Sequence, residues 1–237
     1  MHAILPLKDL VAAKSRLGGL LSVSERRALM QAMVEDVLSL LAEHPQVDGI
    51  TLVSDDPGAG HLAAACGARH LDERSLGRAG LNLVLEATVD RVIDDGDTRI
   101  LVLHGDLPLL GRSDISAVVT ALDNGAGVVI GCDGAGLGTN LLAFTAASRP
   151  RLAFGVDSCA RHRQAAQAVT SSIEVLKTPG IGLDVDEPAD LLELLAALPG
   201  RTAHGKTGAL LLNTPLGQRL SLALAGDADD DNRETAS

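Results

Sequence analysis

Two short segments place carboxylates where an apolar run of the chain ends. Residues 104–108 read His-Gly-Asp-Leu-Pro, and residues 182–188 read Gly-Leu-Asp-Val-Asp-Glu-Pro. In an extended backbone Asp184 and Asp186 project to the same side, because side chains alternate with a period of two. Asp106, from the end of another expected strand, can meet them there. Three convergent carboxylates repel one another but suit a hard cation, so we predict a magnesium site, as in enzymes that handle phosphates.

Cations gather in the segment that follows the first expected strand. Lys8, Lys14 and Arg16 lie there, with Asp9 as the one acid. A lysine acts on phosphate as a point charge, whereas an arginine can bind two oxygens at once. Because the chain has a formal charge of −11, it needs local cations to hold a nucleoside triphosphate. We predict that these three residues contact one, and that Lys8 and Lys14, with Asp106, are catalytic; the alternative is an ordinary solvated loop.

Candidate base-recognition residues precede one of the expected helices. Asn82 offers a donor and an acceptor from one amide, as recognition of a nucleobase requires, and Gly80 permits close approach of the backbone. The alternative for Asn82 is a helix cap. Residues 54–56, Ser-Asp-Asp, follow another expected strand and are a second candidate for the base or the metal.

A second anion site is expected around residues 139–162. Thr139 follows a glycine-rich loop, and Ser158 begins an expected helix whose N–H groups and dipole attract anions. Arg161 and His162 lie in the first turns of that helix, where cations oppose the dipole unless an anion binds. The alternative for both is exposed helix surface. His104 we interpret as a structural histidine.

The composition restricts the class of protein. Of 237 residues 46% are hydrophobic, with two Phe, no Trp and no Tyr, so the core consists of aliphatic side chains. The negative charge and the scarcity of aromatics argue against a nucleic-acid binder. No apolar run approaches the ~20 residues of a membrane helix. The three cysteines form no CxxC motif, which argues against structural zinc, and their odd number, with no signal peptide, favours a cytoplasmic protein. We interpret the cysteines as core residues or as incidental.

Apolar runs and helix caps alternate along the chain. They predict strands over 3–7, 49–54, 99–103, 127–132, 140–144, 173–176 and 181–185. They predict helices after a capping box at 22–25 and over 61–66, 82–94, 113–122, 158–169 and 188–198. This β-α alternation predicts a mostly parallel sheet with helices on both faces, and ligands beyond the carboxyl ends of its strands. We expect a domain over 1–200 and a C-terminal extension over 201–237, whose last ~11 residues are acidic and disordered.

Seven segments in this order resemble the guanylyltransferases of the deazaflavin coenzyme F-420 pathway. They are Pro6–Lys8, Ala13–Leu17, Gly80–Asn82, Gly105–Pro108, Gly138–Asn140, Phe154–Ser158 with Arg161 and His162, and Leu183–Pro188. Related sugar and molybdopterin nucleotidyltransferases carry a glycine-rich loop after the first strand. Here residues 7–16 contain no glycine, which favours the F-420 family over those relatives.

The resemblance implies a three-layer α/β nucleotidyltransferase fold of the glycosyltransferase-A type. It also implies transfer of GMP from GTP to a phosphorylated three-carbon acid, with release of pyrophosphate; the acceptors across the family are phosphoenolpyruvate, 3-phospho-D-glycerate and 2-phospho-L-lactate. By resemblance, Asp106, Asp184 and Asp186 hold Mg²⁺, and Thr139, Gly155 and Ser158 contact the acceptor. The product would pass to the next transferase of the pathway.

Several alternatives stay open from the sequence. Phosphoenolpyruvate is our first choice of acceptor, with 3-phospho-D-glycerate next. Another nucleotidyltransferase, of molybdopterin or sugar-phosphate type, or a non-catalytic nucleotide-binding protein on this fold would share many of these features. The oligomeric state is open, with a homodimer as one option.

Overall fold

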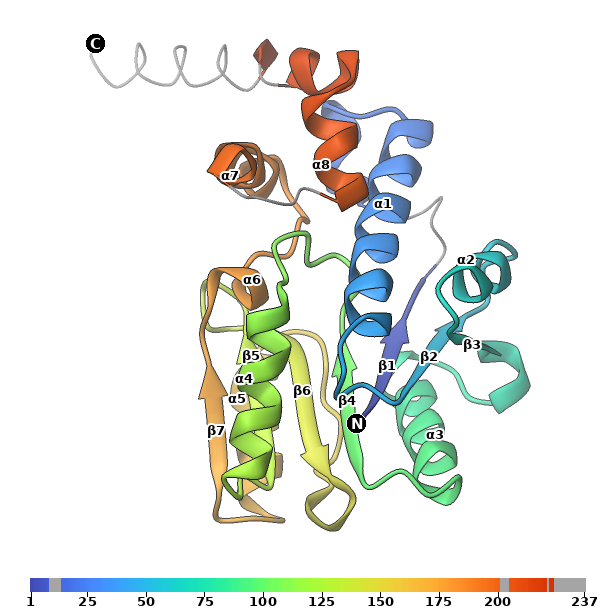
Figure 1. Ribbon diagram of the computed structural model, residues 1–237, viewed down its shortest axis with the longest axis vertical. Helices are drawn as coiled ribbons and strands as arrows, with labels where there is room; N and C mark the ends of the chain where they lie inside the picture. Colours follow the sequence, from blue (N-terminus) through green and yellow to red (C-terminus); the bar gives the residue numbers. More distant parts are fainter. Residues whose placement is uncertain (9–13, 201–204, 221, 224–237) are drawn as a thin grey trace.

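A seven-stranded sheet with helices on both faces forms the body of the molecule (Figure 1). The computed structural model describes residues 1–8, 14–200, 205–220 and 222–223. The strands are β1 (His2–Pro6), β2 (Gly49–Ser54), β3 (Arg69–Asp72), β4 (Arg99–Leu103), β5 (Val128–Cys132), β6 (Thr139–Thr145) and β7 (Ile173–Leu176). The helices are α1 (Val23–Ala42), α2 (Ala59–Ala65), α3 (Leu81–Asp94), α4 (Arg112–Asp123), α5 (Ser158–Gln167), α6 (Pro179–Gly182), α7 (Pro188–Ala197) and α8 (Gly205–Leu212).

The strand order is β3-β2-β1-β4-β6-β5-β7. All pairings are parallel except those that β6 makes with β4 and β5. The expected mostly parallel, mixed sheet is therefore confirmed. Because β1 and β4 are parallel neighbours, the segments that follow them lie side by side beyond the carboxyl ends of these strands, where ligands bind in such folds.

Alternation along the central strands divides the core into two clusters. Ala3 and Leu5 of β1 belong to a cluster that includes α1 and α4. Ile4, between them, belongs to a second cluster that includes α3 and α5. Period-two alternation thus buries both faces of the sheet and gives the three layers expected of the fold.

The capping box predicted before α1 is present. The Ser22 hydroxyl accepts from the Glu25 backbone N–H at 3.3 Å, and the Glu25 carboxylate accepts from the Ser22 N–H at 2.8 Å. Such a cap contributes about 1 kcal/mol by satisfying N–H groups at the helix start. It fixes where α1 begins, and α1 covers the sheet beside the site described below.

Two sequence expectations about elements are wrong. Residues 181–185 are not a strand: Pro179 starts α6, and the Thr178 hydroxyl caps it by accepting from the Ile181 N–H at 3.2 Å. Asp114 packs so closely on Gly180 that a Cβ there would lie 2.1 Å from its carboxylate oxygen. The second error is β3, an edge strand expected as loop, in which Leu71 alone is buried.

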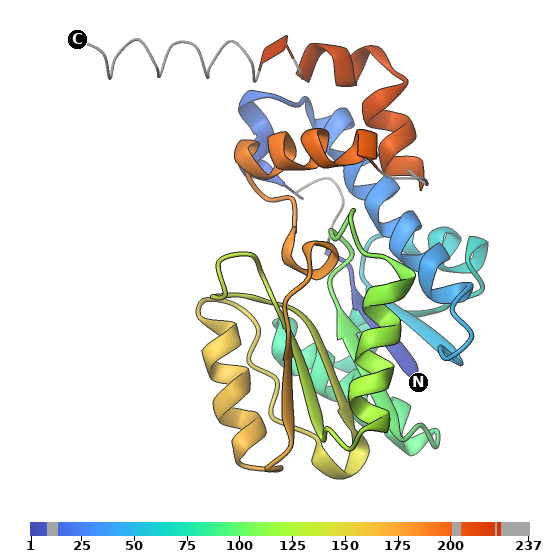
Figure 2. The ribbon, with the colours of Figure 1, turned by 60° about the vertical axis from the view of Figure 1, so that its left-hand side comes forward.

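The chain after residue 204 returns to the main domain. Helix α8 packs along α1, and Asp36 of α1 accepts from the backbone N–H groups of Lys206 and Thr207 at 2.7 and 2.9 Å. Figures 1 and 2 show α7 and α8 beyond the carboxyl ends of the strands. The acidic residues 227–237 lie outside the described residues. Within the described part, no helix has the length and apolar character needed to span a bilayer.

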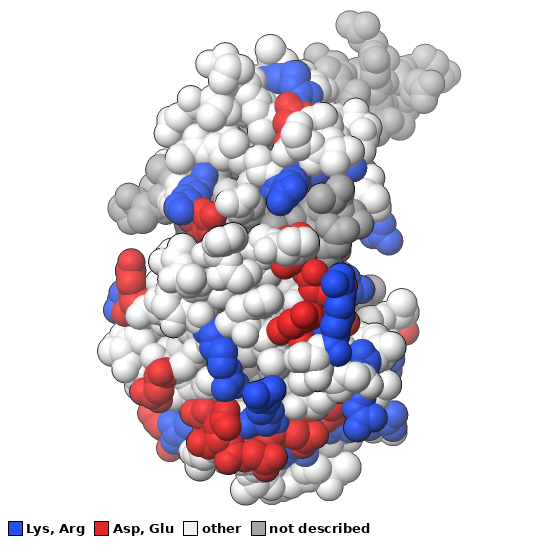
Figure 3. Space-filling view, turned by 90° about the vertical axis from the view of Figure 1, so that its right-hand side faces the viewer, with Lys and Arg blue, Asp and Glu red and all other residues white. Residues whose placement is uncertain are grey.

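The described basic side chains do not form a separate surface on the face drawn in Figure 3, where they lie among Asp and Glu. Many are paired with acids, as Arg69 is with Asp95 and Arg99 with Asp123 at 2.8 and 2.6 Å.

Candidate active site

The carboxyl ends of β1 and β4 open onto a small cavity of about 260 Å³. Two of the predicted catalytic residues line it directly after these strands, Lys8 after β1 and Asp106 after β4. The other lining residues come from β1, the segment near Lys14, α1, α3, the segment after β4 and the segment before α7. They are Pro6, Lys14, Met30, Leu81, His104, Gly105 and Asp186. The fold thus joins five distant parts of the sequence around one space.

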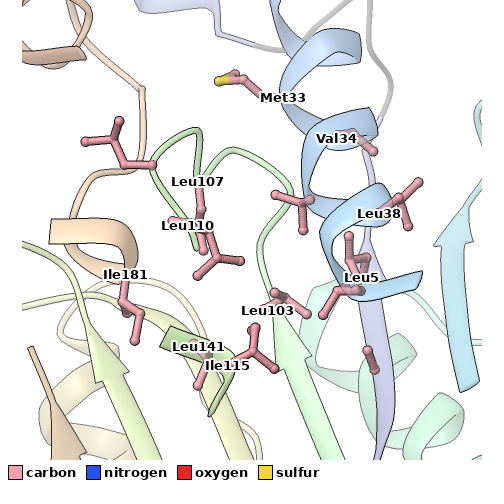
Figure 4. Close-up of a cluster of buried hydrophobic side chains, with 14 of the residues drawn as sticks. Leu5, Met33, Val34, Leu38, Leu103, Leu107, Leu110, Ile115, Leu141 and Ile181 are labelled. Carbon is pink, nitrogen blue, oxygen red and sulfur yellow. The ribbon is translucent and has the colours of Figure 1, made fainter. Parts of the chain in front are cut away.

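The segment that carries Asp106 is held by packing on both sides. Gly105 lies against α1, where an added Cβ would come within 2.8 Å of a Val34 methyl group. Leu107 and Leu110, 1% and 8% exposed, enter the core that contains Leu103 (Figure 4). Asp106 is therefore presented from a rigid segment, which suits a group that must hold a charge in a fixed place.

Lys14 joins two of the predicted metal ligands. Its ammonium donates to Oδ2 of Asp106 and, at 2.6 Å, to Oδ1 of Asp186, and its side chain is only 6% exposed. Burial opposes the charge on Lys14, but the two carboxylates outweigh it and raise the pKa of the amine. Burial likewise opposes ionisation of Asp106, yet Lys14 and nearby His104 lower the pKa of that carboxyl. Both groups are therefore charged at neutral pH.

Asp184 lies next to this pair. The backbone N–H of Val185 donates to the Asp106 carbonyl at 3.3 Å, which ties the two acidic segments together. Burial and the like charges of Asp106 and Asp186 raise the pKa of Asp184, against a hydrogen bond from Asn140 that lowers it. The three carboxylates thus share one electrostatic environment, as crowded carboxylates of a cation site do.

Asn140 is a site residue to which the sequence reading gave no role. Its side-chain amide donates to Oδ1 of Asp184 and to the carbonyl of Ile181, both at 2.9 Å. It fixes the orientation of Asp184 from the neighbouring strand β6. Asparagine is depleted in strands, so a buried Asn within the run 139–145 was the available signal.

The residues at this site fit a divalent cation. Oδ1 of Asp106 is buried and has no hydrogen-bond partner, and the Lys14 ammonium stands between two of the carboxylates as a monovalent cation would. As the side chains stand, no three acidic, His or Cys groups among the described residues are arranged to hold a metal ion together. Asp106, Asp184 and Asp186 would be the residues to hold Mg²⁺, and the contacts of Lys14 with Asp106 and Asp186 would have to give way for them to do so.

Asn82 has its amide engaged within the protein. Its Nδ2 donates to the Phe154 carbonyl at 3.0 Å, and its Oδ1 accepts from the Phe154 N–H at 2.7 Å. This pair of bonds joins the start of α3 to the segment before α5. Gly80 caps α3 with φ = 89°, a conformation that favours glycine.

The remaining nucleotide candidates lie apart from the Lys14 cluster. Arg16 pairs with Glu187 at 2.7 Å and lines a larger cavity of about 970 Å³ beside α6 and α7. Asp186 lines both cavities, so the two spaces adjoin. Asp56 is buried and accepts from the Gly58 N–H at 2.7 Å where the chain turns into α2.

The predicted acceptor residues come together at the start of α5. The Thr139 backbone N–H donates to the Ser158 hydroxyl at 2.8 Å, and Gly155, at φ = 116°, lies in the loop before the helix. The N–H groups of Ser158 and Cys159 already donate to the carbonyls of Gly155 and Leu137. The N–H groups of these first two residues of α5 are therefore already engaged within the protein.

His162 is neither a cation on the helix surface nor an exposed residue. His162 is fully buried, and its ring packs edge-on against the ring of Phe154, with the two ring centroids 4.7 Å apart. Burial, with lesser contributions from Arg161 and His104, lowers the pKa of His162 to about 4. Arg161 alone is left as a cation here; a Cβ on Gly155 would lie 3.3 Å from its guanidinium.

Acid should destabilise the protein through His162. Between pH 6.5 and about 4 the unfolded chain protonates this histidine while the folded protein does not, so the free energy of unfolding falls as the pH drops through this range. The loss attributable to His162 is at most ~3 kcal/mol and is absent above pH 6.5. Urea unfolding of wild type and His162→Asn from pH 4.5 to 7.5 measures it: the variant should show the shallower dependence, and equal slopes would contradict the assignment.

Cys132 and Cys159 are buried in the core, as one of the two expectations had it, but they are also paired with each other, which was not expected. Cys132 at the end of β5 and Cys159 in the first turn of α5 form a disulfide, with Cα atoms 5.9 Å apart. The bond joins the start of α5 to the sheet, next to Ser158. Cysteine usage is therefore no argument for a reducing compartment, and Cys66 is the one cysteine left free.

The chain matches the family model described as "Guanylyl transferase CofC like" over residues 1–207. It is 38% identical over 219 residues to phosphoenolpyruvate guanylyltransferase from Conexibacter woesei, covering 90% of this chain and 97% of the relative. It is 34% identical to 3-phospho-D-glycerate guanylyltransferase from Phenylobacterium zucineum, covering 84% of this chain and 92% of the relative. The 2-phospho-L-lactate guanylyltransferase from Methanothermobacter thermautotrophicus is 32% identical, with 86% and 87% covered.

Solved structures support the fold. A putative nucleotide-diphospho-sugar transferase from Desulfovibrio desulfuricans G20 superposes with a TM-score of 0.79 at 17% identity, covering 93% of this chain and 96% of that one. Glucosyl-3-phosphoglycerate synthase from Mycobacterium tuberculosis, solved with Mg²⁺ and uridine diphosphate, gives a TM-score of 0.56 at 15% identity, with 81% and 73% covered. These similarities confirm the glycosyltransferase-A-like nucleotidyltransferase architecture expected from the sequence.

Proposed function

The chain belongs to the CofC-like guanylyl transferase family, and from that premise we propose that it moves GMP from GTP to the phosphate of phosphoenolpyruvate and releases pyrophosphate. Relatives named as phosphoenolpyruvate guanylyltransferases, at 38% identity from Conexibacter woesei and 34% from Sphaerobacter thermophilus, favour this acceptor. The observation that carries the proposal is the Lys14–Asp106–Asp186 cluster at the carboxyl ends of β1 and β4, in which the Lys14 side chain is buried between the two carboxylates.

The proposed reaction is a displacement at the α-phosphorus of GTP. An acceptor phosphate oxygen forms the new P–O bond, and the bond to the β-phosphate oxygen breaks with its electron pair going to pyrophosphate. The nucleophile is already ionised near neutral pH, so no proton must be removed. Catalysis then rests on positioning and on neutralising negative charge.

The residues of the cavity suit that task. Lys14 and Lys8, which both line the cavity, would neutralise phosphate oxygens. Asp106, Asp184 and Asp186 would hold Mg²⁺, with Asn140 keeping Asp184 in place. When bound, the metal supplies Lewis-acid stabilisation of the phosphoryl oxygens. With its amide engaged by Phe154, Asn82 would support guanine binding through the position of α3 and the backbone near Gly80.

A competition assay tests the assignment. Purified protein with GTP and Mg²⁺ is offered phosphoenolpyruvate, 3-phospho-D-glycerate and 2-phospho-L-lactate together, and pyrophosphate release is measured. The next transferase of the pathway is included, because we propose that it consumes the product. We expect phosphoenolpyruvate to be used first and ATP or CTP not to replace GTP. Preference for another acid would change the acceptor, and release without any acid or with every nucleotide would refute guanylyl transfer.

A further inference from the structure

His104 lines the small cavity directly after β4 and has no role in the proposed reaction. Its backbone N–H donates to the Asn140 carbonyl at 3.0 Å, which extends the pairing of β4 with β6 by one residue. A Cβ on Gly105, the next residue, would face Val34 of α1. The His104 ring instead contacts Phe154, on the other side of the sheet. The backbone at this point therefore directs His104 away from α1, toward the layer that contains α3 and α5.

The His104 ring is held in place by packing. It lies edge-on against the ring of Phe154, with the ring centroids 5.3 Å apart and the planes at 85°. Phe154 is 5% exposed, and its backbone forms two hydrogen bonds with the Asn82 side chain. Within residues 1–8, 14–200, 205–220 and 222–223, no group forms a hydrogen bond with a ring nitrogen of His104. The imidazole thus has a fixed place beside the cavity, with its donor and its acceptor unused by those residues.

His104 lies between the residues proposed for the phosphates and those proposed for the base. Asp106, in the same cavity as the two lysines, is two residues further along the chain. Phe154, which the His104 ring contacts, is joined to Asn82 in the first turn of α3. Leu81, the first residue of α3, also lines the cavity. Since the ribose of a nucleoside triphosphate joins the base to the α-phosphate, phosphates at the lysines and a base at the start of α3 would leave the ribose next to His104.

We propose that His104 binds a hydroxyl group of the ribose of GTP, and so favours ribonucleotides over deoxyribonucleotides. This inference rests on the proposed function and adds to it how the sugar is recognised. A neutral imidazole carries one donor and one acceptor, and a hydroxyl group can act as either partner, so the bond does not depend on which ring nitrogen carries the proton. A phosphate oxygen only accepts, and Lys8 and Lys14 already supply donors for it in the same cavity.

Equilibrium binding tests this contact without requiring turnover. Isothermal titration calorimetry with Mg²⁺ and no acceptor compares GTP with 2′-deoxy-GTP and 3′-deoxy-GTP. We expect wild type to bind one of the two analogues about tenfold more weakly than GTP, because that analogue lacks the hydroxyl group bonded to His104. His104→Phe, which keeps an aromatic ring against Phe154, should weaken GTP binding about tenfold and change the binding of that analogue by less than about twofold.

Two further variants separate the hydrogen bond from the packing of the ring. His104→Gln keeps a donor and an acceptor at the end of its side chain and should retain part of the preference for GTP. His61→Phe, a change at an exposed histidine of α2 that does not line the cavity, is the matched control and should bind all three nucleotides as wild type does. An effect of His104→Phe that is equal for GTP and both analogues would overturn the inference, because it would place the contact on a phosphate or the base, or in packing alone.

The wild-type comparison depends on neither an acceptor nor the folding of a variant. Equal binding of the three nucleotides by wild type would overturn the inference outright. A preference of wild type for GTP that His104→Phe abolishes, together with transfer of GMP to none of the three acids, would refute the proposed function and leave the ribose contact in place. Wild type that binds none of the three nucleotides would refute both.

Discussion

Replacing Asp106 with asparagine should lower the kcat of GMP transfer by about 10³-fold or more while leaving the fold intact. Asn is isosteric with Asp, and the segment is held independently by Gly105 against α1 and by Leu107 in the core. The substitution removes the charge that faces Lys14 and the buried oxygen Oδ1, which has no protein partner. Without the Asp106 carboxylate the site would bind Mg²⁺ more weakly, and the negative charge of the transferred phosphoryl group would be neutralised less well.

Single-turnover rates with saturating GTP, Mg²⁺ and acceptor measure this effect, and circular dichroism with thermal unfolding checks the fold. Asp123→Asn is the matched control, because Asp123 is an exposed acid paired with Arg99 at the amino ends of the strands. It should retain full activity. Turnover by Asp106→Asn within a factor of a few of wild type would remove Asp106 from the mechanism.

Replacing Lys14 with methionine should have two opposite effects. The kcat/KM for GTP should fall by about 10²-fold, because a buried cation that can neutralise phosphate is lost. Binding of Mn²⁺ in the absence of nucleotide should become tighter, because Lys14 no longer competes for Asp106 and Asp186. If the proposed function holds, Lys14 would oppose the metal in the free protein and assist the nucleotide in the complex.

Electron paramagnetic resonance titration of Mn²⁺ and thermal unfolding with and without Mg²⁺ measure the second effect. Without metal, Lys14→Met leaves three carboxylates facing one another, so its Tm should be lower than that of wild type and should rise more when Mg²⁺ is added. Lys14→Arg, which keeps the charge, should resemble wild type more closely in Tm. Weaker Mn²⁺ binding by Lys14→Met would show that the lysine does not occupy the cation position.

Local patterns of the sequence determined most of the elements. Within a few residues a local pattern predicts a helix or a strand. Examples are the capping box at Ser22 and Glu25, the β-branched run over 49–54 and the apolar run over 99–103. Side-chain periodicity and caps act over short distances, so they can be read without knowing the fold. The position of Asp106 after β4 follows from the same local information, and the β-α alternation sufficed for the mostly parallel sheet.

Only the tertiary structure decided what each polar side chain contacts. The sequence offers Asn82 as a donor and acceptor and His162 as a cation, but the amide of Asn82 meets Phe154, and His162 is buried as a neutral donor to Thr139. The pairing of Cys132 with Cys159 is likewise seen only in the folded protein. These partners come from segments 23 to 172 residues apart in the chain. Burial then determines the charge of a side chain through desolvation, and no local sequence pattern contains that information.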